Sequence, residues 1–296
     1  MVAPDIIVCE PAPGYIGRRR YRDMTKGRLG IIACPMLEDE LIVSLNEDPE
    51  EKRIIVIETP YNGSLKRKMV AKGMKFEEID EMDFMNGWID IDPERYNVII
   101  KMNSLGLHAE PLKLKTFIQD ELIMLSGRVD AVGLYYGMCG NYGWDITKWS
   151  EEKLPFRVEV FRDCKGRVCD DCIGVAVGGL DGYKELLKRY TGMLLLTPAV
   201  ATNWIDFLSA GEIGQSLRMV PSSGDPKKDM KDLLVMCGYT SAVQIDTGLE
   251  DRAEFDKCTK DMIDYLGFKL YQAPADMADK GPMIRIYEEC KRDLSA

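Results

Sequence analysis

The stretch LGIIACPMLEDELIVSLN, residues 29–46, contains the pattern that decides the fold. Leu29 to Ala33 is a short apolar run that predicts a buried strand, and Met36 to Asn46 has apolar residues at helical spacing. Cys34 and Pro35 separate the two segments, and a proline suits the first turn of a helix. A buried strand followed at once by a helix is the repeating unit of a parallel α/β sheet.

The same pattern of strand and helix recurs along the chain. Further runs rich in β-branched residues predict strands at Arg53–Glu58, Tyr96–Lys101, Val129–Tyr136, Phe156–Phe161, Met193–Thr197, Ser241–Asp246 and Phe268–Tyr271. Segments with helical periodicity lie between several of them, at Ser64–Gly73, Pro111–Leu125, Gly182–Tyr190 and Ala253–Leu266. We therefore predict an α/β fold of Rossmann-like type, with mostly parallel sheet or sheets covered by helices on both faces.

The predicted organisation has three parts. Residues 1–28 read as an N-terminal arm with the basic cluster Arg18–Arg22, and residues 29–220 as an α/β domain. The turn-forming segment Pro221–Pro226 is a candidate linker because it interrupts both periodicities. Residues 227–296 then form a smaller C-terminal α/β part, either separate or integral to the same domain.

Composition and charge exclude several classes of protein. The chain has 296 residues, a net charge of −10 and no apolar run long enough for a membrane span. The segment Met1–Glu10 lacks the features of a signal peptide, so we expect a cytoplasmic protein without membrane contact. Binding to nucleic acid is disfavoured, because such binding depends on neutralising phosphates.

Cysteines and the single histidine are the residues that suggest chemistry. Cys34, Cys139 and Cys172 each lie shortly after a predicted strand, and His108 follows another. Ligands of parallel sheets bind beyond the carboxyl ends of the strands, so these four side chains are expected at one edge. Three thiolates and one imidazole form a tetrahedral set that suits Zn²⁺. The alternative is that the cysteines are ordinary buried thiols.

Two other arrangements use some of the same residues. Cys164, Cys169 and Cys172 have the spacing C-x4-C-x2-C, which is one of those that hold iron–sulfur clusters, and Cys139 would supply the fourth ligand. Cys139 could instead act as a nucleophile with His108 as its base.

Further candidate residues lie beside the cysteines. Asp171 either acts as a base or supports a ligand, or else caps the helix that starts at Cys172. Asp246, at the end of the predicted strand Ser241–Asp246, is a candidate cofactor-binding residue if it faces the same cleft as the cysteines, and otherwise belongs to a strand-end turn. Glu38 and Glu40 are interpreted as the outer face and first turn of a helix. Close approach of the backbone to a cofactor is expected at three positions near Cys139, which are Gly137, Gly140 and Asn141.

Several of these stretches together resemble a family of uncharacterised archaeal and bacterial proteins catalogued as a domain of unknown function. The resemblance runs from about Leu29 toward the C-terminus and is carried by Ile31–Leu41, Leu107–His108 with Pro111, Tyr136–Asn141, Asp171–Ile173 and Ile245–Gly248. The motif Y-G-x-C-G-N at Tyr136–Asn141 is its most specific part. The family pattern selects Cys34, His108, Cys139, Asp171 and Cys172.

The resemblance also implies a biological context. Members of the family are often encoded beside corrinoid-dependent methyltransferases of C1 metabolism, so it implies a corrinoid protein or a methyltransferase as the partner. The chain departs from the family just before Asp171, where the stretch Arg167–Asp170 replaces the usual Pro-Arg and histidine. This departure removes a second imidazole and leaves open whether Cys169 substitutes as a ligand.

The leading hypothesis is a zinc protein of methyl-group metabolism, with Zn²⁺ bound by Cys34, Cys139, Cys172 and His108. An exchangeable position on such a zinc would allow it to activate a thiol as methyl acceptor, and His108 would then be a base. Two alternatives remain. The first is a [4Fe–4S] cluster on the same three cysteines, and the second is a non-catalytic accessory protein that binds a methyltransferase or corrinoid protein through its acidic surface.

Overall fold

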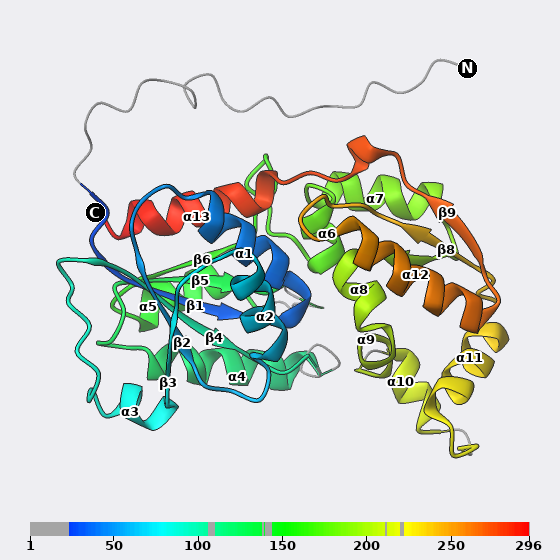
Figure 1. Cartoon of the computed structure of the whole chain (residues 1–296), viewed down its shortest axis with the longest axis horizontal. Helices are drawn as coiled ribbons and strands as arrows, with labels where there is room; N and C mark the ends of the chain where they lie inside the picture. The colour runs from blue at the N-terminus through cyan, green and yellow to red at the C-terminus, as the bar shows by residue number, and fades with distance from the viewer. Residues whose placement is uncertain are drawn as a thin grey trace.

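The structure, a computed structural model, describes residues 24–105, 110–137, 139, 144–210, 212–219 and 222–295. In these residues the chain forms two lobes, each built on its own parallel sheet (Figure 1). The first lobe contains β1 (Gly27–Ala33), η1 (Pro35–Leu37), α1 (Glu38–Glu47), β2 (Arg53–Ile57), α2 (Gly63–Ala71), β3 (Glu77–Ile79), α3 (Glu81–Met85), β4 (Tyr96–Met102), α4 (Pro111–Met124), β5 (Ala131–Tyr135), α5 (Ile146–Lys153), β6 (Arg157–Val160) and α13 (Gly281–Asp293).

The second lobe is smaller and richer in helix. It contains α7 (Leu180–Arg189), β7 (Leu194–Leu196), α8 (Pro198–Thr202), α9 (Trp204–Ala210), α10 (Glu212–Leu217), α11 (Pro226–Met236), β8 (Ser241–Gln244), α12 (Arg252–Leu266) and β9 (Lys269–Gln272). The short helix α6 (Cys172–Ala176) lies at the junction of the lobes, and η3 (Ala275–Met277) leads back to α13.

The first sheet has six parallel strands in the order β3-β2-β4-β1-β5-β6. The central strand β1 pairs with β4 on one side and β5 on the other, so that Ala33 lies opposite both Met102 and Tyr135. Continuous apolar runs such as Ile31–Ala33 are buried because helices cover both faces of the sheet. Helices α1 and α13 pack together on one face, and α4 lies on the other (Figure 1).

The second sheet has three parallel strands in the order β7-β8-β9. Strand β7 precedes the predicted linker in sequence, whereas β8 and β9 follow it. Its described residues, 222–226, therefore lie within the second lobe and do not separate the lobes. The chain passes between the lobes at α6 and again before α13. The C-terminal part 227–296 is therefore divided between both lobes.

Helix α13 returns to the first lobe and is held there by a buried charge network. Lys291 donates hydrogen bonds to Asp48 at 2.8 Å and to Glu50 at 2.7 Å, and the Tyr287 hydroxyl donates to Asp48 at 2.9 Å. The Tyr287 hydroxyl also lies 2.9 Å from that of Tyr96, at the start of β4. These contacts join the C-terminal helix to the end of α1 and to the central sheet.

The predicted fold class is confirmed, because both sheets are parallel and alternate with helices. All the strands predicted from apolar runs are present, and β3 is an addition to them. Among the described residues, no helix combines the length and apolar character needed to cross a membrane.

Candidate functional site

The candidate site lies where the carboxyl ends of the two sheets face each other. Helix α8, which follows β7, packs on η1, which follows β1. The loop after β8 also reaches the first lobe, because Thr247 and Leu249 line a pocket together with Glu40 and Met283. In the first sheet, β1 leads to α1 on one face, whereas its neighbour β4 leads to α4 on the other. Such a change of direction opens a crevice at the carboxyl edge, where α/β proteins bind ligands.

The backbone joins the three segments that carry the predicted cysteines. Cys34 lies directly after β1, and its N–H donates to the carbonyl of Tyr135 at the end of β5, at 3.0 Å. Cys139 lies in the loop after β5, and its N–H donates to the carbonyl of Asp170 at 2.6 Å. Cys172 is two residues further on, at the first position of α6. Backbone hydrogen bonds therefore tie the three positions together.

Gly137 brings two of these segments into direct contact. A Cβ at this position would lie 2.5 Å from both the Cα and the carbonyl carbon of Asp171, and 2.7 Å from the nitrogen of Cys172. Only glycine allows this approach, so the predicted glycine is needed for contact with the Asp171–Cys172 backbone. Gly140 and Asn141, the other predicted cofactor-binding residues of this loop, lie outside the described residues.

The three thiols, which we call the thiol cluster (Cys34, Cys139 and Cys172), are close enough to influence one another electrostatically. Burial raises the pKa of Cys34 to about 12. Burial is also the main cause of the raised pKa of Cys139, and the charge of Cys34 adds to it. For Cys172, burial comes first, followed by Asp171 and by the other two cysteines. Without a cation beside them, all three sulfurs therefore stay protonated at neutral pH.

The thiol cluster offers sulfur donors of the kind that Zn²⁺ and iron–sulfur clusters take. In the part of the chain that the structure describes, no three Cys, His, Asp or Glu side chains are already placed to hold a metal ion. His108, the predicted fourth ligand, lies in 106–109, outside the described residues. The chemistry of the donor set fits a soft metal, and metal binding would require the three thiols to lose their protons.

Cys139 has an unusual backbone conformation. Its φ of +36° makes it the one non-glycine residue with a positive φ among the described residues. Side-chain-bearing residues rarely adopt this conformation, and they do so most often at functional sites. Cys139 is half-buried, whereas Cys34 and Cys172 are buried.

Asp171 lies beside the thiol cluster but is engaged as a helix cap. Its Oδ1 accepts a hydrogen bond from the N–H of Gly174 at 2.6 Å, at the start of α6. Burial raises its pKa, against the hydrogen bonds from Gly174 and Tyr183. The carboxylate therefore positions Cys172 through the helix that it caps.

Asp246 lies two residues after the end of β8. It accepts a hydrogen bond from the N–H of Gly248 at 2.9 Å and forms an ion pair with Arg252. Both partners belong to the second lobe. The residues that follow Asp246 contact the first lobe, as Thr247 and Leu249 line the shared pocket.

Cys169, of the C-x4-C-x2-C spacing, belongs to a hairpin, where its N–H donates to the carbonyl of Phe161 at 2.9 Å. Burial raises its pKa to about 12, and the charged groups that modify this effect are Asp163, Arg285, Asp170 and Asp171. None of the thiol-cluster sulfurs is among these groups. Cys172, by contrast, is influenced electrostatically by Cys139 and Cys34.

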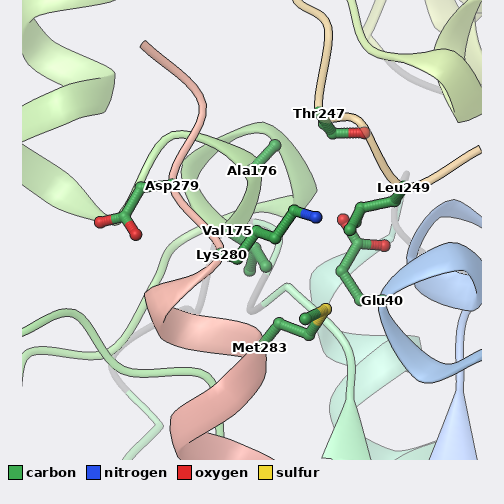
Figure 2. A pocket seen from close by; sticks show the side chains of 8 residues that line it. All are labelled: Glu40, Val175, Ala176, Thr247, Leu249, Asp279, Lys280 and Met283. Carbon is green, nitrogen blue, oxygen red and sulfur yellow. The ribbon is translucent and has the colours of Figure 1, made fainter. Parts of the chain in front are cut away.

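Glu40 is the residue of this region that the sequence interpretation missed. Its side chain is buried and lines a pocket of about 10 Å³, together with Thr247, Leu249 and Lys280 (Figure 2). This volume has room for about one water molecule. Burial, followed by the charge of Asp39, raises the pKa of Glu40 to about 8. The interpretation as an outer helix face was wrong, because the second lobe covers the first turn of α1.

Lys68 of α2 balances the other carboxylates at this junction. Its ammonium lies 2.7 Å from Asp39, 2.9 Å from Glu38 and 3.7 Å from Glu250. The available signal was the acidic run Glu38–Glu40, which lies only five residues after the end of β1. Three consecutive acids in one helical turn cannot all face solvent when both lobes pack on that turn.

The fold and site define a two-lobed parallel α/β protein with a thiol-rich junction. The chain belongs to the family described as "Protein of unknown function (DUF1638)", whose model matches residues 102–279, more than half of the chain. The matched region includes Cys139, Asp171 and Cys172, whereas Cys34 lies outside it. No curated protein and no solved structure matches the chain.

Proposed function

We propose that the thiol cluster binds a soft metal ion, Zn²⁺ in the simplest case, with His108 as a fourth ligand or as a base beside an open position. The observation that supports this proposal is that backbone contacts join the segments of three cysteines far apart in sequence, whose thiols influence one another electrostatically. The hydrogen bonds from Cys34 to Tyr135 and from Cys139 to Asp170 hold their segments together. Buried thiols with raised pKa values are costly to ionise alone, and a cation supplies the compensating charge.

The activity that we propose for this site is methyl transfer to a thiol, with a corrinoid protein or methyltransferase as partner. The resemblance described above suggests this partner, and the position of the site between two lobes would give a substrate access to it. Bound zinc would lower the pKa of a coordinated substrate thiol. The chain itself would contribute a fixed sulfur frame, with Asp171 orienting Cys172 through its cap of α6.

The same three cysteines also suit a [4Fe–4S] cluster with one iron left open. The observation that favours this second candidate is the number of sulfurs, because three thiols leave one iron of such a cluster without a protein ligand. In that case the protein would bind substrate or transfer an electron at the open iron.

Metal analysis of protein purified without oxygen tests the binding proposal. We expect a bound metal in the wild type and its loss in Cys34→Ser, Cys139→Ser and Cys172→Ser. Cys237→Ser is the matched control, because Cys237 is exposed at the end of α11. A colourless protein with zinc supports the first candidate, and a brown protein with iron and sulfide supports the second. Full metal content in the Cys139→Ser variant would refute the site.

Methylcobalamin and 2-mercaptoethanol test the activity. In the expected reaction the cobalt–carbon bond breaks and a sulfur–carbon bond forms. Cobalt leaves as cob(I)alamin with the electron pair, and the thiol proton goes to solvent. Cob(I)alamin is followed by its absorbance, and the methyl thioether by mass spectrometry. Metal-loaded wild type and Cys237→Ser should form both products, whereas Cys139→Ser should not. Absence of product from metal-loaded wild type, with its partner corrinoid protein also supplied, would overturn the proposed activity and leave only metal binding.

A further inference from the structure

Two buried polar side chains flank Cys34 at the carboxyl edge of the first sheet. Ala33 lies opposite Met102 of β4 and Tyr135 of β5. The residues that follow these three strand ends, which are Asn103, Cys34 and Tyr136, therefore form one row across the sheet. The N–H of Asn103 donates to the carbonyl of Ala33 at 2.9 Å. This bond fixes the position of Asn103 relative to the end of β1. Side chains at the same level of neighbouring parallel strands point to the same face.

The row points away from the face that α1 and α13 cover. Tyr135 lies on that covered face, where its ring packs against Phe161 at 5.1 Å between centroids and where Cys290 influences its hydroxyl. Tyr136, one residue later, points to the opposite face, where Cys34, Asn103, Cys139 and Glu121 act on its pKa. Tyr136 and Asn103 therefore share a space with two members of the thiol cluster.

In each of these side chains one polar atom makes no well-formed hydrogen bond to the described residues, although the Asn103 amide lies close enough to the Tyr136 hydroxyl to oppose the rise that burial causes in its pKa. Asn103 is 2% exposed and Tyr136 is 3% exposed, yet neither the Asn103 Nδ2 nor the Tyr136 Oη has a partner within the described part of the chain. A buried polar group without a partner is costly, because it has lost its hydrogen bonds to water. Two such groups side by side, at the edge where α/β proteins bind ligands, indicate that something else completes them.

We propose that Asn103 and Tyr136, which we call the donor pair, form a subsite that binds an uncharged carbonyl oxygen of a small ligand beside Cys34. The Asn103 Nδ2 can only donate, and the Tyr136 hydroxyl can donate its proton, so a carbonyl oxygen with two lone pairs satisfies both. Burial keeps the hydroxyl of Tyr136 protonated, since it raises the pKa of that group.

The surrounding charge selects an uncharged ligand. Glu121 of α4 raises the pKa of Tyr136, so its negative charge acts at the subsite. Lys101 lies 2.6 Å from Glu121 but also 2.6 Å from Glu81, so two carboxylates share one ammonium. A second negative charge beside the donor pair would be repelled. A carboxamide, an ester or a thioester fits, and a carboxylate does not.

This subsite extends the proposed function, since it would place the carbonyl group of a substrate next to the thiol cluster. Ligand binding at this subsite does not require a bound metal, because neither donor is a sulfur and neither has to ionise. A ligand held by these two donors would have its oxygen positioned where any developing negative charge would be stabilised.

Acetamide is the probe, and acetate, which has the same shape with a negative charge, is the comparison. Saturation-transfer NMR measures the binding of each to full-length protein as purified. We expect saturable acetamide binding, weakened about five- to tenfold in Tyr136→Phe and in Asn103→Leu, since each change removes one of two hydrogen bonds. Acetate should bind more weakly than acetamide.

Tyr135→Phe is the matched control, because it removes a buried, unpartnered hydroxyl from the adjacent residue on the other face. Its acetamide binding should equal that of the wild type. Thermal unfolding accompanies each measurement, and Tyr136→Phe should not be less stable than the wild type, because it removes an unsatisfied group. The proposal would be overturned by absence of saturable acetamide binding, by wild-type affinity for acetamide in both donor-pair variants, or by acetate binding as tightly as acetamide.

The same preparations separate this proposal from the metal site. Tyr136→Phe should keep the metal content of the wild type, and Cys139→Ser should keep acetamide binding. If the protein proved to bind no metal, Tyr136→Phe should still bind acetamide more weakly than Tyr135→Phe does. Loss of acetamide binding in Cys139→Ser to the same extent as in Tyr136→Phe would overturn the assignment of binding to the donor pair.

Discussion

Lys68 of α2 lies 3.7 Å from Glu250 in the loop after β8, and this ion pair connects the two lobes. Lys68 also contacts Glu38 and Asp39 of α1, so one ammonium serves three carboxylates from both lobes. Glu38 and Glu250 each keep one buried oxygen without a hydrogen bond in the described structure. The position of the second lobe therefore depends on a cation shared at the junction.

Lys68→Met should destabilise the protein by about 2–4 kcal/mol, because it leaves buried carboxylates without their cation. Glu250→Gln should lower the free energy of unfolding by less than Lys68→Met does, since it removes one negative charge from a cluster in which carboxylates outnumber cations. Chemical denaturation measures both free energies of unfolding. A Lys68→Met variant as stable as the wild type would show that solvent, and not Lys68, compensates these carboxylates.

Stability should fall with rising pH because of Glu40. Burial raises the pKa of Glu40 in the folded protein to about 8, above its ordinary value, so folding favours the protonated form. The stabilisation from protonated Glu40 is fully present below the pKa that Glu40 has in the unfolded chain. It is lost as the pH rises through the folded-state pKa of about 8. Glu40→Gln cannot ionise, so it should gain stability relative to the wild type between pH 6 and pH 9, by roughly 1–2 kcal/mol.

Thermal unfolding of both proteins across this pH range provides the measurement. Glu47→Gln is the control, because Glu47 is an exposed residue at the end of the same helix. The same measurements on Glu47→Gln show the effect of replacing an exposed glutamate of this helix. Parallel pH profiles for Glu40→Gln and the wild type would contradict the assignment of this effect to Glu40.

The strands were predictable because a parallel strand covered on both faces is a continuous apolar run. Ile54–Ile57 and Val98–Ile100 are examples, and both are fully buried. Strand β3 was not predicted, because it is short and two of its three residues are exposed glutamates. The division into two sheets was not predictable, because β7 and β8 have the same apolar pattern as strands of the first sheet. Only pairing across long sequence distances separates them.

The candidate site was predictable to the extent that it depends on strand ends. Cys34 directly follows β1, and Cys139 lies in the loop after β5 of the same parallel sheet. The carboxyl ends of parallel strands lie at one edge of the sheet, so both residues were expected there. The roles of Glu40 and Lys68 were not predictable, since the burial of both depends on the second lobe. Asn103 and Tyr136 required the strand order, because they become neighbours of Cys34 only when β1 lies between β4 and β5.

Lys291→Met should destabilise the protein by about 3 kcal/mol, because Asp48 and Glu50 would lose a buried partner. The matched control is Lys260→Met, where the lysine pairs with Asp264 one helical turn away and is exposed. Exposed pairs of this kind contribute about 0.5 kcal/mol or less. Urea denaturation should therefore separate the two variants clearly. Similar losses in both would show that α13 is not held by this network.

Gly137→Ala tests how closely the loop after β5 must approach α6. A Cβ there would lie 2.5 Å from the Asp171 backbone, which is far shorter than any allowed contact. Backbone cannot move aside as a flexible side chain can, so the loop and α6 should separate. We expect a loss of about 1–3 kcal/mol in stability, as for other overpacked sites. Because Cys139 and Cys172 lie on the two separated segments, metal binding at the thiol cluster should weaken as well.

Gly63→Ala is the control for this substitution. Gly63 opens α2, and a Cβ there would meet only the Arg67 side chain at 3.6 Å. Alanine also favours a helix over glycine, so this variant should be as stable as the wild type or more so. Thermal unfolding and metal content of the two variants are compared under the same conditions. If Gly137→Ala unfolded like Gly63→Ala and kept its metal, the close approach at Asp171 would have no part in holding the cysteines together.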